Sequence, residues 1–151
     1  MTIEKIALWR LKVPLYEPYN LSLGALPELD SIVAEIQYSD GRLGIGDTTV
    51  VPGLTPETVR VAWSFCQTHW ENLIGLDTAA ATAFLDPFRT RHPHAVTVFQ
   101  VALDIIDDNA LLAPPERESA VPILAPVNSR VADRIPDEVE RLLGAGFGTL
   151  K

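Results

Sequence analysis

Residues 121–151 of the sequence contain two apolar segments with a single predicted helix between them. This order constrains the fold more than any other feature. Residues 121–127 (VPILAPV) are apolar without alternation, which is typical of a strand covered on both faces in a parallel sheet. A helix is predicted from Pro136 to Leu143, and residues 147–151 begin a second strand after Gly144 and Gly146. Strand, helix and strand in this order form a right-handed parallel unit, which exposes apolar surface when alone. We therefore expect a larger strand–helix architecture, of which this chain is the first part.

The first fifty residues follow a different pattern, an antiparallel meander. Alternating apolar and polar residues are typical of half-buried strands. The predicted strands are residues 3–13, 29–38 and 42–51. Pro14 and Pro18 predict the end of the first strand and a long loop over residues 15–28, whereas Asp40 and Gly41 predict a tight hairpin turn.

A group of helices is predicted between the meander and the parallel unit. Thr55 is the predicted N-cap of the first helix, with Pro56 at its first position, and Asp77 is the predicted N-cap of the second. The predicted helices end at residues 73, 85 and 112, and the last two begin at residues 78 and 95. Pro114, Pro115 and the charged residues 116–119 form a predicted linker, which divides the chain into domains 1–115 and 116–151.

Composition excludes several classes of partner. A net charge of −8 argues against nucleic acid, because phosphate binding requires clustered Lys and Arg. The sequence contains no apolar run of 18 residues, so no membrane span is predicted. The N-terminus lacks the layout of a signal peptide, and Cys66 is the single cysteine, so we expect a cytoplasmic protein without an internal disulfide.

Four segments together resemble one known family. They are residues 12–36 (KVPLYEPYNLSLGALPELDSIVAEI), 40–49 (DGRLGIGDTT), 101–105 (VALDI) and 144–151 (GAGFGTLK). Their order and spacing are similar to those of the enolase superfamily, in its mandelate racemase/muconate lactonizing enzyme branch. The second segment resembles that branch's DG-x-x-G-x-G-E hairpin, with Asp47 where Glu is usual. Asp107 and Asp108 stand where that branch has bulky apolar residues, so the subgroup stays open.

The resemblance implies an α+β fold and a reaction class. The fold is a capping domain, made of a three-stranded antiparallel meander with a helical bundle, followed by the beginning of a (β/α)₈ barrel. The parent activity is Mg²⁺-dependent abstraction of the α-proton of a carboxylate, by a racemase, epimerase, cycloisomerase or dehydratase. The metal-binding carboxylates of the family lie on later barrel strands. We therefore expect no Mg²⁺ ligand in this chain and no activity of the chain alone.

The resemblance also implies positions for the substrate-facing residues. Two cap loops close over the barrel mouth in the family, and Tyr19, Ser22 and Gly24 correspond to the first of these loops. Val50 and Val51 correspond to the second loop, where they favour a substrate with an apolar part.

Lys151 matches the first Lys of the family's Lys-x-Lys pair, a catalytic position near the substrate carboxylate. The alternative for Lys151 is an ordinary terminal lysine. His92 and His94 lack the spacing of helical metal ligands and fit a helix-entry loop better. Asp104 and Asp108 stand four residues apart, which could mark a cation site, but a solvated face near the helix end explains them better.

Three functions remain open from sequence. The chain is the N-terminal portion of an enolase-superfamily enzyme, or half of a split enzyme completed by a partner, or a non-catalytic binding and dimerisation module. The expected partners are a small carboxylate substrate of the parent enzyme and either further copies of this chain or a barrel-supplying chain. Nucleic acid and membrane are not expected partners.

Overall fold

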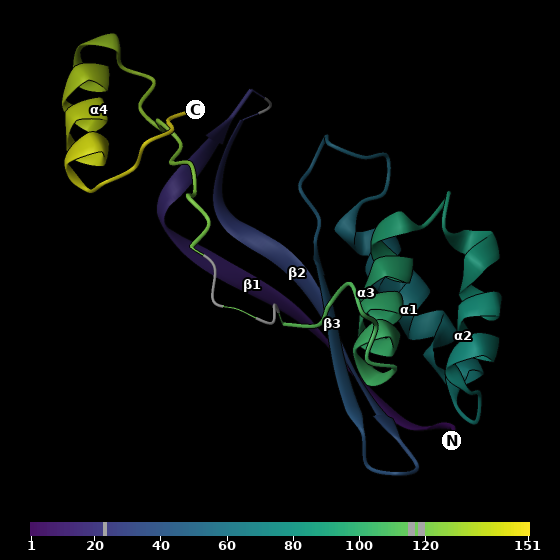
Figure 1. Cartoon of the computed structure of the whole chain (residues 1–151). Helices are drawn as coiled ribbons and strands as arrows, with labels where there is room; N and C mark the ends of the chain where they lie inside the picture. Colours follow the sequence, from purple (N-terminus) through teal and green to yellow (C-terminus); the bar gives the residue numbers. More distant parts are fainter. Residues whose placement is uncertain (23, 115–116, 118–119) are drawn as a thin grey trace. The chain divides into compact units, whose positions relative to one another are not determined.

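The computed structural model describes residues 1–22, 24–114, 117 and 120–151 (Figure 1). Contacts divide this part of the chain into two compact units. The first unit comprises Met1–Leu15 and Glu28–Ala113, and the second comprises Tyr16–Pro27 and Pro114–Lys151. Most of the predicted linker, including the predicted domain boundary between residues 115 and 116, lies outside the described residues. In the described ranges, every helix is too short or too polar to span a bilayer.

Three strands form one sheet in the order β1-β2-β3 (Figure 1). They are β1 (Ile3–Leu21), β2 (Gly24–Tyr38) and β3 (Leu43–Thr49). β2 and β3 pair antiparallel, from Ser31 opposite Thr49 to Gln37 opposite Leu43. The predicted meander is therefore confirmed.

The long loop predicted over residues 15–28 is mostly strand, so this prediction is wrong. β1 continues through Pro14 and Pro18 to Leu21, and β2 begins at Gly24. Proline removes a backbone donor, which a central strand does not tolerate. β1 lies at the edge of the sheet, however, and there a missing donor leaves no broken ladder bond.

Two ion pairs join β1 to β2. The Arg10 guanidinium donates to both carboxylate oxygens of Asp30, at 2.9 and 2.6 Å, and Lys12 pairs with Glu28. Arg10 pairs with Asp30, and two residues further along β1 Lys12 pairs with Glu28, two residues earlier in β2. This order is that of an antiparallel pair. The guanidinium lowers the pKa of the Asp30 carboxyl below its ordinary value.

The first unit also contains three helices. They are α1 (Val59–Leu73), α2 (Thr78–Leu85) and α3 (Pro93–Ile106), and the short 3₁₀ helix η1 (Asp86–Phe88) follows α2. The bounds of α2 agree with the prediction, because Asp77 Oδ1 accepts a hydrogen bond from Ala80 N–H at 2.8 Å. The start predicted for α1 is wrong. Its N-cap is Thr58, whose Oγ1 accepts from Val61 N–H at 3.3 Å, and not Thr55.

α3 is shifted and shortened relative to the predicted helix at residues 95–112. It begins at Pro93, because proline fits the first position of a helix, where its missing N–H costs nothing. It ends at Ile106, since Asp108 adopts a left-handed φ of 51° that cannot continue a helix. The acidic pair Asp107 and Asp108 is thus part of the helix end and its following turn.

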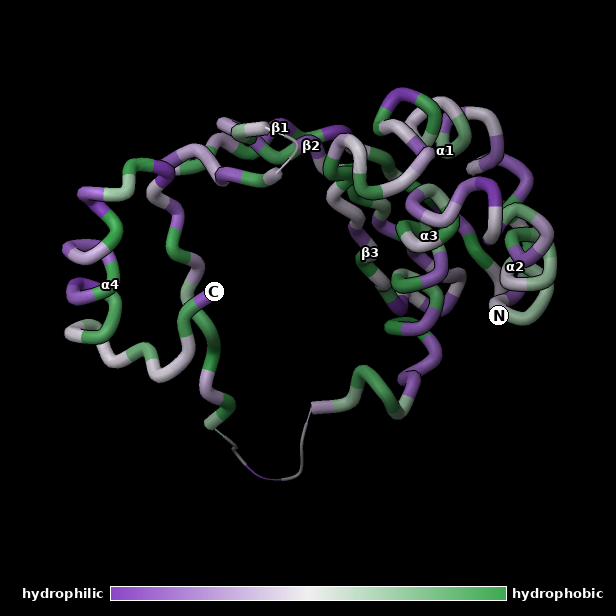
Figure 2. The backbone as a smooth tube through the Cα atoms, turned by 90° about the horizontal axis from the view of Figure 1, so that it is seen from above, coloured by the Kyte–Doolittle hydropathy of each residue, from purple (hydrophilic) through white to green (hydrophobic). Residues whose placement is uncertain are grey.

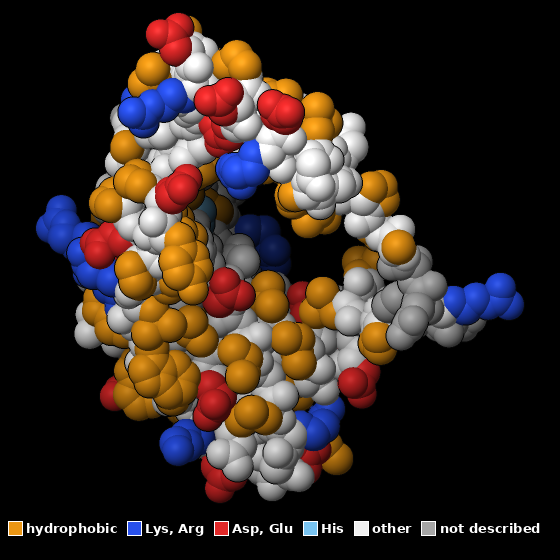
Figure 3. Space-filling model, turned by 90° about the vertical axis from the view of Figure 1, so that its left-hand side faces the viewer, with side chains coloured by type: hydrophobic (Ala, Val, Ile, Leu, Met, Phe, Trp, Pro, Cys, Tyr) orange, Lys and Arg blue, Asp and Glu red, His pale blue; other side chains and the backbone are white. Residues whose placement is uncertain are grey.

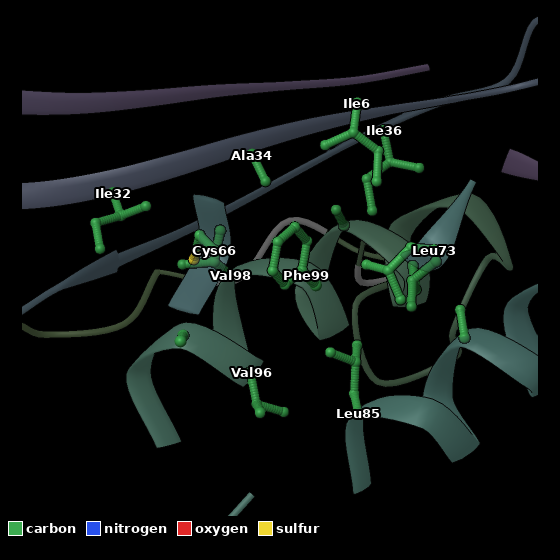
Figure 4. Packing of buried hydrophobic residues seen from close by; sticks show 14 of the residues in the cluster. Ile6, Ile32, Ala34, Ile36, Cys66, Leu73, Leu85, Val96, Val98 and Phe99 are labelled. Carbon is green, nitrogen blue, oxygen red and sulfur yellow. The ribbon is translucent and has the colours of Figure 1, made fainter. Parts of the chain in front are cut away.

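The hydrophobic core lies between one face of the sheet and the helices. Ile32, Ala34 and Ile36 alternate along β2, and all three are fully buried on that face (Figure 4). Phe99 of α3 and Cys66 of α1 are buried in the same cluster. Burying a side chain such as Ile or Phe contributes about 1.5–3 kcal/mol, so this face holds the unit together.

In the second unit, the two predicted strands, residues 121–127 and 147–151, are the first and second paired segments. They pair in parallel, as the strand–helix–strand pattern predicts. Ala125 N–H donates to Thr149 O at 3.0 Å, and Lys151 N–H donates to Ala125 O at 3.0 Å. Val127 N–H donates to Lys151 O at 2.8 Å. The pairing is a single bridge between Ala125 and Leu150 rather than a full ladder, so the paired region is shorter than the two predicted strands.

One helix connects the two paired segments. α4 (Ile135–Gly144) follows the short 3₁₀ helix η2 (Ala132–Arg134), close to the predicted bounds. α4 carries both hydrophilic and hydrophobic residues (Figure 2), and Leu142 is its buried residue. Several large apolar side chains of the first paired segment remain exposed. These are Val121, Ile123 and Leu124, with 75%, 68% and 51% of their surface accessible.

Candidate functional site

The candidate site lies in the second unit, where the first paired segment ends. The parallel pairing fixes the backbone of Lys151 against Ala125 and Val127. Asn128 follows Val127 directly, so Asn128 and Lys151 lie at the same end of the pair. In strand–helix folds this carboxyl end of the strands is where functional groups gather.

The tip of the β1–β2 hairpin, Tyr16–Pro27, is hydrogen-bonded to Asn128. Asn128 Oδ1 accepts from Asn20 N–H at 2.9 Å, and Asn128 Nδ2 donates to Pro18 O at 2.8 Å. Asn20 Nδ2 donates in turn to Asn128 O at 2.8 Å. Arg130 adds a hydrogen bond from its guanidinium to Leu21 O. The hairpin tip is therefore attached to the end of the first paired segment.

Glu138 of α4 fixes the turn that carries Asn128. Its two carboxylate oxygens accept hydrogen bonds from Asn128 N–H at 2.9 Å and from Ser129 N–H at 2.8 Å. Both donors stabilise the charged form, so the Asn128 and Ser129 amides hold the pKa of the Glu138 carboxyl below its ordinary value. The turn thus has a charged anchor on the helix that follows it.

An open groove with a volume of about 830 Å³ lies between the hairpin tip and the first turns of α4. Its lining is strongly charged. Glu17 and Asn20 line it from the hairpin, and Arg130, Arg134 and Asp137 line it from the other side. A groove that offers both cations and anions suits a polar ligand with separated charges.

The residues predicted for the first loop all lie in this hairpin tip. Tyr19 and Ser22 are exposed, and Gly24 has a φ of 136°, which favours glycine at the start of β2. Lys151 is exposed at the paired strand end. Their contact with a substrate stays a prediction. Sequence reasoning did not identify Asn20 and Asn128, which are 108 residues apart and belong to no local motif.

The residues predicted for the second loop lie in the first unit, at the end of β3. Val50 is 3% exposed and packs in the hydrophobic core, with its N–H donating to Asp30 O at 3.1 Å. Val51 is half-buried. The core therefore already uses the Val50 side chain, and the apolar wall expected from both valines remains a prediction.

A buried polar cluster anchors the segment that follows Val51. Glu57 is 5% exposed, and its Oε2 accepts from His94 N–H at 2.6 Å in the first turn of α3. His94 Nδ1 and Nε2 lie 3.0 Å from the hydroxyls of Thr48 and Thr55. Thr55 donates to Glu57 O, so it accepts from Nε2–H. Both ring nitrogens of His94 are therefore hydrogen-bonded to threonine hydroxyls, which fixes the orientation of the ring.

His92 lies beside this cluster as the N-cap of α3. Its Nδ1 lies 3.4 Å from Glu57 Oε1. The placement of both histidines agrees with the helix-entry interpretation rather than with a metal site. Within the described ranges, no three side chains of His, Cys, Asp or Glu are grouped closely enough to hold a metal ion.

The sheet, the helices and the following strand–helix unit have the fold of a portion of several solved mandelate racemase/muconate lactonizing enzyme and enolase-superfamily structures. A dipeptide epimerase from Cytophaga hutchinsonii, solved with Mg and D-Ala-L-Val, matches 99% of this chain and 43% of its own, with a TM-score of 0.85 and 19% identity. An N-succinyl Arg/Lys racemase from Bacillus cereus matches the same shares with a TM-score of 0.83 and 17% identity. An enolase-superfamily member from Roseovarius nubinhibens, solved with magnesium, has a TM-score of 0.75 and 21% identity over 98% of this chain and 43% of its own. The predicted fold class is confirmed.

Sequence comparison also finds epimerases. An aromatic dipeptide epimerase from Herpetosiphon aurantiacus is 28% identical over 76 residues, which are 50% of this chain and 21% of the relative. A D-Ala-D/L-Ala epimerase from Cytophaga hutchinsonii is 26% identical over 106 residues, 68% of this chain and 29% of the relative. No family model matches the chain. The matched segments thus span less than a third of the curated relatives.

Mg²⁺ accompanies several of the similar structures, including three dipeptide epimerases solved with dipeptides. The described residues of this chain do not fit such an ion, because they contain no group of three carboxylate, imidazole or thiolate ligands. We therefore assign no metal-dependent step to them.

Proposed function

We propose that this chain forms the capping domain and first barrel elements of an enolase-superfamily epimerase or racemase. The sequence relatives are dipeptide epimerases, so a dipeptide is the first carboxylate substrate to test. The observation that carries the proposal is the attachment of the hairpin tip to the strand end through Asn20 and Asn128. This contact supports the proposal, because barrel enzymes act at the carboxyl ends of their strands and the hairpin tip is bonded to such a strand end.

In this proposal, the chain binds and encloses the substrate. Tyr19, Ser22 and Gly24 present the hairpin tip to the substrate and exclude water from it. Lys151 places a cation beside the substrate carboxylate, where it stabilises the charge that develops when the α-proton leaves. Proton abstraction and metal binding are assigned to barrel strands other than the two described in the second unit.

The test is to restore a barrel and measure α-proton exchange. The 151-residue chain is fused to the remaining barrel of the Cytophaga hutchinsonii dipeptide epimerase and incubated with Ala-Val dipeptides in D₂O. We expect Mg²⁺-dependent deuterium incorporation by the fusion and none by the chain alone. A folded fusion that binds Mg²⁺ and incorporates no deuterium would contradict the proposal. Lys151→Ala in the fusion is expected to reduce incorporation, whereas Lys5→Ala on β1 is the matched control.

A second candidate is a module that associates through its exposed apolar segment, either with a barrel-supplying chain or with itself. Val121, Ile123 and Leu124 favour it, because each exposes half or more of its surface. On the face shown in Figure 3, hydrophobic side chains lie among interspersed acidic and basic ones. Light scattering on the purified chain tests this candidate. A stable monomer that captures no barrel fragment would exclude it.

A further inference from the structure

We propose that Asn128 is a positioning residue that holds the hairpin tip at the strand end through its side-chain amide. The effect of this residue on substrate binding rests on the proposed function. The hydrogen bonds between Asn128 and the hairpin tip are observed independently of that function. Asn128 matches no motif in the sequence, and its partner Asn20 is 108 residues away.

β1 is an edge strand of the sheet. β1 pairs with β2 on one side, and among the described residues the backbone groups on its other side have no neighbouring strand in the sheet. Pro18 O and Asn20 N–H belong to residues i and i+2, so they point to the same edge. Pro18 contributes no N–H, which leaves one acceptor and one donor for a partner to satisfy.

The Asn128 amide matches this pair of groups. Its Oδ1 accepts from Asn20 N–H at 2.9 Å, and its Nδ2 donates to Pro18 O at 2.8 Å. An amide carries both a carbonyl oxygen and an NH₂ group, which a carboxylate or a hydroxyl of similar length does not combine. One side chain thus takes the place of a neighbouring strand over two residues.

The contact between the two asparagines is reciprocal, and other hydrogen bonds hold the Asn128 backbone in place. Asn20 Nδ2 donates to Asn128 O, so each asparagine binds the backbone of the other. Glu138 holds the Asn128 backbone through its N–H, and Val127 next to it is paired with Lys151. A continuous hydrogen-bonded path therefore runs from Lys151 to the hairpin that carries Tyr19. Displacing Asn128 would change the position of the hairpin relative to Lys151.

Hydrogen exchange of the Asn20 amide tests the contact directly in the 151-residue chain. We expect Asn128→Ala to accelerate exchange of the Asn20 amide about ten-fold or more, because its acceptor is removed. Asn128→Asp keeps an acceptor for Asn20 N–H and loses the donor to Pro18 O, so a smaller acceleration is expected. Asn72→Ala, on the exposed side of α1, is the matched control. Amides of α3 such as Phe99 report that the fold is intact.

Unchanged exchange of the Asn20 amide in Asn128→Ala would overturn the inference. If that variant does not fold, the smaller acceleration in Asn128→Asp decides in its place. In the barrel fusion, we expect Asn128→Ala to raise KM about ten-fold with little change in kcat, because fewer molecules hold the hairpin in its binding position. A fusion without activity and with a protected Asn20 amide would contradict the proposed function alone. An unchanged KM with an accelerated amide would refute the role in substrate binding.

Discussion

Gly46 of β3 lies so close to Val98 of α3 that a β-carbon on the glycine would stand 2.1 Å from the Val98 carbonyl oxygen. Gly44 has the same relationship to Ala102, where the distance would be 2.0 Å. No real Cβ approaches an oxygen that closely. The spacing between β3 and α3 is therefore set by backbone against backbone, and glycine is the residue that permits it.

Replacing Gly46 by alanine is expected to lower the free energy of unfolding by about 3 kcal/mol, because the strand and helix must separate to admit a methyl group. Urea denaturation measures the change. Gly144→Ala is the control, since its β-carbon would meet no atom within 4 Å and its φ is not left-handed. Equal stabilities of the two variants would contradict the close approach.

Glu57→Ala is expected to lower the free energy of unfolding by about 1–2 kcal/mol, because it leaves the His94 N–H at the start of α3 without its acceptor. Glu57→Gln retains a carbonyl oxygen at that position and is expected to cost less. Thermal unfolding of both variants gives the comparison, with the exposed Glu71→Ala on α1 as the control. A Gln variant as unstable as the Ala variant would show that the charge, rather than the hydrogen bond, matters.

The anchor of the Asn128 turn is expected to weaken in acid. The folded pKa of Glu138 is below its ordinary value, so its stabilising contribution is complete above the ordinary glutamate pKa. The contribution is lost as pH falls through the lower folded pKa. In an NMR titration, we expect the Glu138 carboxyl and the Asn128 and Ser129 amides to share one midpoint below that of an unfolded glutamate. Glu138→Gln should remove the pH dependence of both amides.

Cys66 is expected to be inert in the folded protein. It is fully buried in the core, and burial, with a smaller contribution from Glu57, raises the pKa of its thiol to about 12. The thiolate is the reactive form of cysteine. At pH 8 very little Cys66 is thiolate, and a reagent cannot reach the buried sulfur, so we expect no reaction. Labelling with a maleimide, followed by mass spectrometry, should give no adduct in native buffer and one adduct in urea. Rapid native labelling would mean that α1 opens readily.

Local chemistry made part of the fold predictable. Asp77 caps α2 through an interaction that spans three residues, so sequence alone predicts its start correctly. The length of β1, in contrast, could not be predicted from local sequence. Pro14 and Pro18 normally end strands, and their tolerance depends on the edge position, which is decided by the whole sheet. The N-cap at Thr58 depends on Thr55 and Glu57 being held by His94, again a distant partner.

The candidate site also has one part that sequence could predict and one part that it could not. Tyr19, Ser22 and Gly24 can be assigned to one loop because a family resemblance covers that segment, and the structure places them in one hairpin tip. Asn20 and Asn128 form their contact across 108 residues, and asparagine is common in turns for other reasons. Periodicity and capping signals carry no information about such a pair.

The prolines of β1 also bear on how copies of this chain behave toward one another. A 19-residue strand with a free edge is a template on which a strand from another molecule can stack, the first step toward fibrils. Pro18 cannot donate to an incoming strand, and Asn128 occupies the neighbouring groups. A strand from another molecule therefore cannot pair with this part of the edge, so the residues that orient the hairpin also restrict intermolecular β-pairing there.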